Sequence, residues 1–176
     1  MAEDWPVIDR AVEYDPGWYS GGYDLVEQPD GTRKRYYWAS LPPAVVVVAI
    51  DGDTVIMVEQ YRPIIREHHL ELPAGIVEDD ESYVEAGKRE LREETGYVAG
   101  SVDHIQTYAV ATGVLRHDRG VVVATELEQS TPDRDQNEFL RVTRVPVADA
   151  LERAREKPAN DSTISSLLLA TADGYL

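Results

Sequence analysis

Apolar runs and alternating stretches along the chain predict several short strands. Residues 44–50 form an uninterrupted apolar run rich in β-branched valine, which is typical of a strand buried on both faces. The turn Asp51-Gly52-Asp53 then leads into a second strand over residues 54–60. Further strands are expected where β-branched and aromatic residues gather between turn signals, at residues 23–28, 33–40, 70–72, 104–111, 120–127 and 139–145.

Three helices are expected as well. The first is preceded by Asp79 and Asp80, which supply N-cap chemistry, and followed by Gly96, which suits the C-terminal cap. The three predicted helices cover residues 82–94, 147–156 and 162–172. Mixed strands with a few interposed helices favour an α/β sandwich over a strictly alternating βα fold.

The net charge of the chain limits the classes of partner that it can bind. Among 176 residues, 33 acidic side chains oppose 17 basic ones, and the net charge is −16. Binding to a nucleic-acid backbone is excluded and an anionic membrane surface disfavoured, because both need a cationic surface. The shortage of lysine favours adaptation to high intracellular salt, where carboxylates keep the surface hydrated. An ordinary acidic protein is the alternative.

Cysteine usage and the N-terminus indicate the compartment. The chain has no cysteine, which rules out disulfides, thiolate metal sites and a cysteine nucleophile. Its N-terminus has neither a basic segment nor an apolar one, so we expect no signal peptide. The longest apolar run is far too short to span a membrane. We therefore expect a soluble, cytoplasmic protein.

Carboxylates cluster on the first predicted helix. Glu90 and Glu94 are four residues apart and stack on one face, with Glu93 on the next flank. Stacked like charges destabilise a helix unless a cation offsets them, and hard oxygen ligands favour Mg²⁺ or Mn²⁺. The alternative is a solvated helix face on which Glu85 and Arg89 form an i,i+4 ion pair.

The spacing around this helix matches a known motif. Gly75 is followed at fixed steps by Glu81, Arg89, Glu90, Leu91, Glu93, Glu94, Gly96 and Tyr97. This is the complete pattern G-x5-E-x7-R-E-U-x-E-E-x-G-U, in which U is a bulky apolar residue. The sequence therefore resembles the Nudix hydrolases, which cleave nucleoside diphosphates linked to another moiety. The resemblance implies an α/β/α sandwich with a mixed sheet over residues 44–176, preceded by an antiparallel β extension over residues 1–43.

The resemblance also implies roles for single residues. Glu90 and Glu94 correspond to the principal metal ligands, and Glu93 to an assisting ligand of the catalytic set. The backbone carbonyl of Ala74 resembles a further ligand. The implied cofactor is Mg²⁺, with Mn²⁺ as an alternative. Divalent ions of this kind bridge carboxylates and phosphate oxygens and activate water for attack at phosphorus.

Three more residues take catalytic roles by resemblance. Arg89 and Glu81 look like the pair that holds the loop against the helix. Glu138 matches a loop glutamate that serves the family as general base or orients the water. A plain surface position is the alternative for Glu138, because the segment around it offers several carboxylates.

The segments that flank the motif indicate a branch of the family. Glu59-Gln60-Tyr61-Arg62-Pro63 followed by Glu71-Leu72-Pro73-Ala74-Gly75 resembles the ADP-ribose pyrophosphatases and their nucleotide-sugar relatives, as do the stretches at residues 137–142 and 161–164. Arg62 is a candidate for binding the terminal ribose or phosphate, since a guanidinium group makes bidentate phosphate contacts. A surface ion pair is the alternative role.

One position departs from that branch. Where the branch carries proline before glycine, this chain has Thr112 before Gly113. Gly113 is kept and is a candidate substrate-binding residue. Arg116, in the unusual stretch that follows, is expected either to bind a phosphate or base or merely to decorate a strand connection.

Aromatic residues are frequent before residue 44. They are Trp5, Trp18, Tyr19, Tyr23, Tyr36, Tyr37 and Trp38. Such side chains stack on adenine, and in ADP-ribose hydrolases a corresponding N-terminal sheet packs against a second subunit and contributes to its site. The resemblance thus implies a homodimer, while a β-hairpin that covers its own core is the alternative.

The combined prediction is an enzyme that hydrolyses ADP-ribose to AMP and ribose 5-phosphate with Mg²⁺ and metal-activated water. The first alternative is a hydrolase of GDP-mannose or of nucleoside diphosphate sugars more broadly. The second is a non-catalytic Nudix module that senses a nucleotide. The intact set Glu90, Glu93 and Glu94 speaks against the second alternative.

Overall fold

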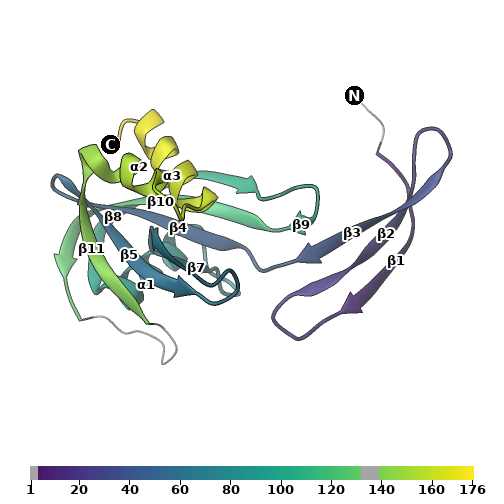
Figure 1. Ribbon diagram of the computed structural model, residues 1–176, viewed down its shortest axis with the longest axis horizontal. Coiled ribbons are helices and arrows are strands. Elements are labelled where there is room, and N and C mark those ends of the chain that lie inside the picture. The colour runs from purple at the N-terminus through teal and green to yellow at the C-terminus, as the bar shows by residue number, and fades with distance from the viewer. Residues whose placement is uncertain (1–3, 132–138) are drawn as a thin grey trace. The chain divides into compact units, whose positions relative to one another are not determined.

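The computed structural model describes residues 4–131 and 139–176 of the chain (Figure 1). These residues belong to two compact units. The smaller unit comprises Met1–Pro43 and Tyr108–Asp118, and the larger comprises Ala44–Thr107 and Arg119–Leu176.

The smaller unit is built on a four-stranded sheet in the order β1-β2-β3-β9. Its strands are β1 (Val7–Tyr14), β2 (Ser20–Glu27), β3 (Arg33–Ser40) and β9 (Leu115–Arg116). β2 pairs antiparallel with both β1 and β3, whereas β9 pairs parallel with β3. The predicted hairpin over residues 23–28 and 33–40 is confirmed. β1 was not expected from the sequence pattern, and most of its residues are exposed.

The larger unit contains a mixed sheet in the order β11-β5-β4-β10-β8. The five strands are β4 (Ala44–Asp51), β5 (Thr54–Arg62), β8 (Tyr97–Ala109), β10 (Asp118–Gln129) and β11 (Leu140–Pro146). β10 runs parallel to β4, and β11 runs antiparallel to β5. Two short strands complete the sheet: β6 (Glu67–Glu71) pairs with β5, and β7 (Ala74–Ile76) pairs with β4.

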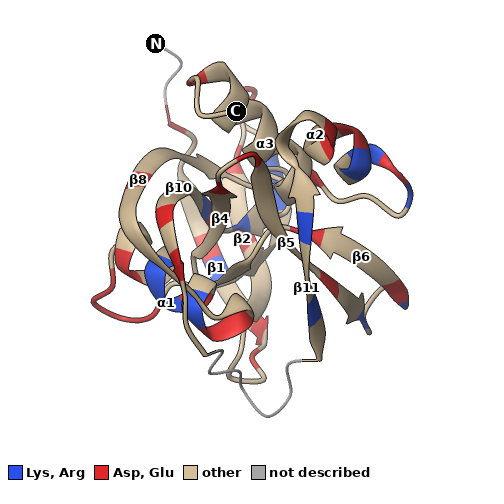
Figure 2. Cartoon of the chain, turned by 90° about the vertical axis from the view of Figure 1, so that its left-hand side faces the viewer, with Lys and Arg blue, Asp and Glu red and all other residues tan. Residues whose placement is uncertain are grey.

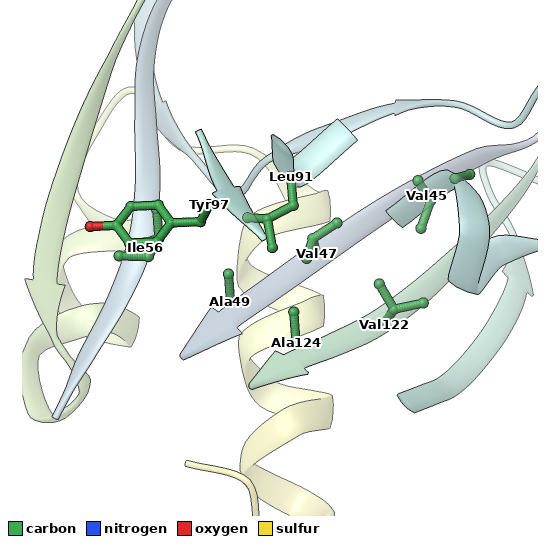
Figure 3. Close-up of a cluster of buried hydrophobic side chains, with 9 residues drawn as sticks. Val45, Val47, Ala49, Ile56, Leu91, Tyr97, Val122 and Ala124 are labelled. Atoms are coloured by element: carbon green, nitrogen blue, oxygen red, sulfur yellow. The ribbon is translucent and has the colours of Figure 1, made fainter. Parts of the chain in front are cut away.

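Helices cover both faces of this mixed sheet (Figure 1). α1 (Tyr83–Thr95) lies on one face, and α2 (Val147–Arg155) and α3 (Asp161–Ala172) lie on the other. Because side chains alternate along a strand, Val45, Val47 and Ala49 of β4 face Leu91 of α1 (Figure 3). The predicted α/β/α sandwich with a mixed sheet is therefore confirmed. No helix among residues 4–131 and 139–176 is long and apolar enough to cross a membrane.

The ends of α1 show one success and one error of the sequence prediction. Gly96 closes the helix in the left-handed conformation with φ 76°, as expected. The N-cap is Ser82, and not Asp79 or Asp80. Ser82 Oγ accepts from the Glu85 N–H at 3.2 Å, and the Ser82 N–H donates to the Glu85 carboxylate at 2.8 Å. This reciprocal capping box fixes the start of the helix.

Candidate functional site

The predicted carboxylates lie on the side of α1 that packs against the sheet. Glu90 and Glu94 are only 7% and 4% exposed, and Glu93 is half-buried. Gly87 permits this close approach, because a Cβ there would lie 2.7 Å from a methyl group of Val122. Buried carboxylates are costly without compensating partners, so the neighbours of these groups decide what the site can do. Figure 2 shows the acidic and basic positions of α1 together.

Arg89 is the first of these partners. Its Nε and Nη2 donate to the two oxygens of Glu81 at 2.9 and 3.0 Å, and Nη2 also donates to the Ile76 carbonyl at 2.8 Å. Its Nη1 donates to Glu90 Oε1 at 2.8 Å and to Glu93 Oε2 at 3.1 Å. A single guanidinium group therefore ties the segment before α1 to two of its carboxylates.

These contacts shift the ionisation of the pair. The hydrogen bonds from Arg89 hold the pKa of Glu81 below its usual value. The same carboxylate is the main cause of the raised pKa of the Arg89 guanidinium. Both groups are therefore charged near neutral pH, and Arg89 offsets part of the negative charge of the helix.

Strand β7, which precedes α1, supplies the second set of partners. The Ala74 N–H donates to Glu94 Oε2 at 3.2 Å. Gly75 lies directly against Glu90, since a Cβ on Gly75 would be 1.9 Å from Glu90 Oε1. The backbone of β7 thus forms a cradle for two carboxylates, and a side chain at position 75 would displace the Glu90 carboxylate.

The carboxylates of α1 do not converge on one point in this structure. Within residues 4–131 and 139–176, no three histidine, aspartate or glutamate side chains converge as a cation site. Glu90 and Glu93 instead accept hydrogen bonds from the same atom, Arg89 Nη1. The loop and the helix nevertheless bring Ala74, Glu81, Arg89, Glu90, Glu93 and Glu94 together, as the motif spacing predicts.

Arg62 lies elsewhere in the larger unit, at the end of β5. Its Nε and Nη2 donate to Glu71 Oε2 at 2.9 and 2.6 Å. Glu71 is buried, and it also accepts from Gln60 Nε2 at 2.8 Å and from Asn160 Nδ2 at 3.0 Å. Arg62 therefore has a buried ion-pair partner, while 44% of its own side chain remains exposed.

The other two predicted substrate contacts belong to the smaller unit. Gly113 is exposed, with open space where a Cβ would stand. The Arg116 guanidinium lies over the Trp38 ring, 4.0 Å from its centroid, and donates to Asp24 Oδ2 at 2.6 Å. Arg116 lies in β9, and Trp38 and Asp24 hold its guanidinium group in a defined position. Glu138 lies outside the described residues.

The mixed sheet lies between helices and forms an α/β/α sandwich. Its candidate active site is the group of carboxylates on α1 that lie against Ala74 and Gly75. The model of one family, the NUDIX domain, matches residues 40–167. The chain therefore belongs to the Nudix family, and it is a hydrolase.

Individual relatives agree with this assignment. The chain is 32% identical to an ADP-ribose pyrophosphatase of Bacillus subtilis, over 78% of this chain and 76% of the relative. It is also 32% identical to a methanol dehydrogenase activator of Bacillus methanolicus, over 79% and 77%. It is 28% identical to the ADP compounds hydrolase NudE of Escherichia coli, over 72% and 68%.

A solved structure shows the same fold. The crystal structure of an ADP compounds hydrolase superposes with a TM-score of 0.89 and covers 100% of this chain and 99% of the other. The two sequences are 22% identical.

Proposed function

We propose that the protein hydrolyses the diphosphate bond of ADP-ribose and releases AMP and ribose 5-phosphate. The observation that carries the proposal is the pair of buried carboxylates, Glu90 and Glu94, set against the Ala74–Gly75 loop. Relatives named ADP-ribose pyrophosphatase and ADP compounds hydrolase support the substrate class. The proposed substrate is accordingly an ADP-linked sugar.

The residues present fit a divalent cation. The donor set consists of hard oxygen atoms only, from Glu90, Glu93, Glu94 and the Ala74 carbonyl, which suits Mg²⁺ and also Mn²⁺. The absence of a side chain at Gly75 leaves the Glu90 carboxylate against the loop backbone. When bound, Mg²⁺ would polarise the phosphate oxygens and lower the pKa of a bound water.

The chain's own groups would arrange this chemistry. Arg89 and Glu81 hold the segment before α1 against the helix, so that the loop carbonyl and the carboxylates keep a common geometry. Arg89 also donates to Glu90 and Glu93, which orients both carboxylates. Glu138 remains our candidate for the group that takes a proton from the attacking water.

Substrate contacts are proposed for Arg62, Gly113 and Arg116. Arg62 and Arg116 present guanidinium groups held by Glu71 and Asp24 respectively, and a positioned guanidinium suits phosphate and ribose oxygens.

A homodimer is proposed in which residues 1–43 form part of the interface. The smaller unit exposes many large apolar side chains, an arrangement that favours association. They are Trp5, Val7, Ile8, Val12, Tyr14, Trp18, Tyr36 and Tyr37.

Two other functions have specific support. Thr112, in place of the proline expected for ADP-ribose specificity, favours a broader nucleoside diphosphate sugar hydrolase, with GDP-mannose as the leading substrate. The relative named methanol dehydrogenase activator favours a regulatory role. We also propose that the protein is cytoplasmic and adapted to high salt.

A product assay tests the proposal. ADP-ribose, ADP-glucose and GDP-mannose are each incubated with the protein and Mg²⁺ or Mn²⁺, at low and at molar KCl, and the nucleotide products are quantified. We expect AMP and ribose 5-phosphate from ADP-ribose at the highest rate. Preference for GDP-mannose would refute the substrate assignment alone, and no turnover of any substrate would refute the enzymatic function.

A further inference from the structure

Residues 71–75 lead into the carboxylate site of α1, and each of them is held by a contact from another element. At the first, the Glu71 carboxylate accepts from Gln60, Arg62 and Asn160. At the second, the Leu72 N–H donates to Thr163 Oγ1 at 3.2 Å.

The last three residues of this segment are held by backbone and carboxylate groups. The Pro73 carbonyl accepts from the Val47 N–H at 2.9 Å. The Ala74 N–H donates to Glu94, and Gly75 packs against Glu90. The contacts at Glu71 and Leu72 thus lie within three residues of Ala74 on the same short segment.

Two of these contacts come from the beginning of α3. Asn160 is the N-cap of α3, and its Oδ1 accepts from the Thr163 N–H at 2.8 Å and from Ser162 Oγ at 2.8 Å. The other end of the same amide, Nδ2, donates to Glu71 Oε1 at 3.0 Å. Thr163 is 1% exposed, and its hydroxyl is the acceptor for Leu72. The cap and the first turn of α3 thus contact both residues at the start of the segment.

Stability of α3 alone explains only half of this arrangement. Capping requires the Asn160 carbonyl oxygen, but it does not require the amide nitrogen to face a buried carboxylate. Likewise, a threonine at position 163 is not needed to continue the helix, where its hydroxyl would ordinarily bond to its own backbone or to water. Both donor and acceptor are instead directed at the segment that ends in Ala74 and Gly75.

We infer that Glu71, Asn160 and Thr163 are positioning residues. They fix where the Ala74 carbonyl and Gly75 lie relative to the carboxylates of Glu90 and Glu94. The inference rests on the proposed function, because it takes the Ala74 carbonyl and the α1 carboxylates as the metal site. It assigns a role to the Asp161-Ser162-Thr163-Ile164 stretch and to the cap residue Asn160 before it: Thr163 and Asn160 anchor the segment that ends in Ala74 and Gly75.

Metal binding by the isolated protein is the appropriate readout. Thr163→Val removes the acceptor for the Leu72 N–H but keeps the volume of the side chain, and Thr163→Ser restores the hydroxyl. Thr171→Val is the matched control, because Thr171 Oγ1 bonds within the helix, to the Leu167 carbonyl, at the far end of α3. Mn²⁺ affinity is measured by titration calorimetry, and thermal melting is followed for each variant.

A second variant separates capping from positioning. Asn160→Asp keeps the oxygen that caps α3, since aspartate and asparagine are equally good N-caps, but it places a carboxylate where Nδ2 now donates to Glu71. Helix content, measured by circular dichroism, should be retained while Mn²⁺ binding weakens. This variant also decides the matter if Thr163→Val does not fold.

The expected results follow from the usual effect of residues that orient ligands. Thr163→Val and Asn160→Asp should weaken Mn²⁺ binding about 10-fold, whereas Thr163→Ser and Thr171→Val should stay within about 2-fold of the wild type. Unchanged affinity in Thr163→Val and Asn160→Asp, or an equal loss in Thr171→Val, would overturn the positioning role. A wild-type protein that binds no Mn²⁺ would overturn the proposed function as well, which distinguishes the two failures.

Discussion

Replacing Gly75 by alanine tests the cradle that holds the Glu90 carboxylate. A Cβ at this position would lie 1.9 Å from Glu90 Oε1, 2.0 Å from its Cδ and 2.4 Å from its Oε2. All three nearest atoms belong to the end of one flexible side chain. The backbone of β7 therefore need not move, and Gly75→Ala should fold.

The size of the effect follows from the distance. To go from 1.9 Å to an ordinary contact of about 3.4 Å, the carboxylate of Glu90 must retreat by about 1.5 Å. Misplacement of a reacting or ligating group by about 1 Å costs about 100-fold in rate. Gly75→Ala should thus lose at least about 100-fold in kcat/KM for ADP-ribose. Its unfolding free energy should stay within about 1 kcal/mol of the wild type.

The assay compares AMP release with urea unfolding of the same preparations. Gly21→Ala is the control, because the nearest atom to a Cβ there is 3.7 Å away, an ordinary contact, and its activity should match the wild type. The reasoning is refuted if Gly75→Ala retains wild-type kcat/KM. It is also refuted if activity falls only in proportion to a loss of folded protein.

Three further predictions concern stability. The pKa of Glu81 is held below its ordinary 4.5 by Arg89, so its stabilisation is present above pH 4.5 and lost as the pH falls through the lowered value. In urea unfolding of metal-free protein, Glu81→Gln should reduce the loss of unfolding free energy that the wild type shows below pH 4.5. The same pH dependence in the variant and the wild type would contradict the ion pair. Ser82→Ala removes the cap bonded to Glu85 and should cost about 1 kcal/mol in the same unfolding assay; no cost would contradict the capping box. Because the net charge is −16, raising KCl from about 0.1 M to about 2 M should raise the melting temperature, and a fall would argue against adaptation to salt.

Local patterns predicted most of the fold. The strand at residues 33–40 has the bounds expected from its sequence, and the valine run at residues 44–50 is the central strand β4. Motif spacing placed Glu90 and Glu94 on one side of α1, where both are buried. These features depend on residues that are near one another in the sequence, so the periodicity of a helix or strand is enough to find them.

The errors have physical causes that are also local. Asp79 and Asp80 are good N-cap residues, but Asp80 adopts φ 70°, a left-handed turn that precedes the helix. The correct signal was the spacing of Ser82 and Glu85, which is that of a capping box. β1 was missed because apolar and polar residues do not alternate strictly along it, so no period of two could be read from its sequence.

Long-range pairing could not be predicted in the same way. Glu71 and Asn160 are 89 residues apart and meet only because β6 and the start of α3 converge. The sequence identified the segments around Glu71 and the start of α3 by family resemblance alone, and it did not indicate that they are in contact. Likewise, Arg62 was expected as a surface or substrate contact, and its buried partner Glu71 emerges only when β5 and β6 pair.

The most direct test of the central claim compares the wild type with Glu94→Gln, using ADP-ribose and Mg²⁺ and quantifying AMP and ribose 5-phosphate. Glu152→Gln, an exposed change on α2, is the matched control. We expect both products from the wild type and the control, and a loss of at least about 100-fold in turnover by Glu94→Gln at an unchanged melting temperature. Near-normal turnover by Glu94→Gln, or no AMP from the wild type, would contradict that claim.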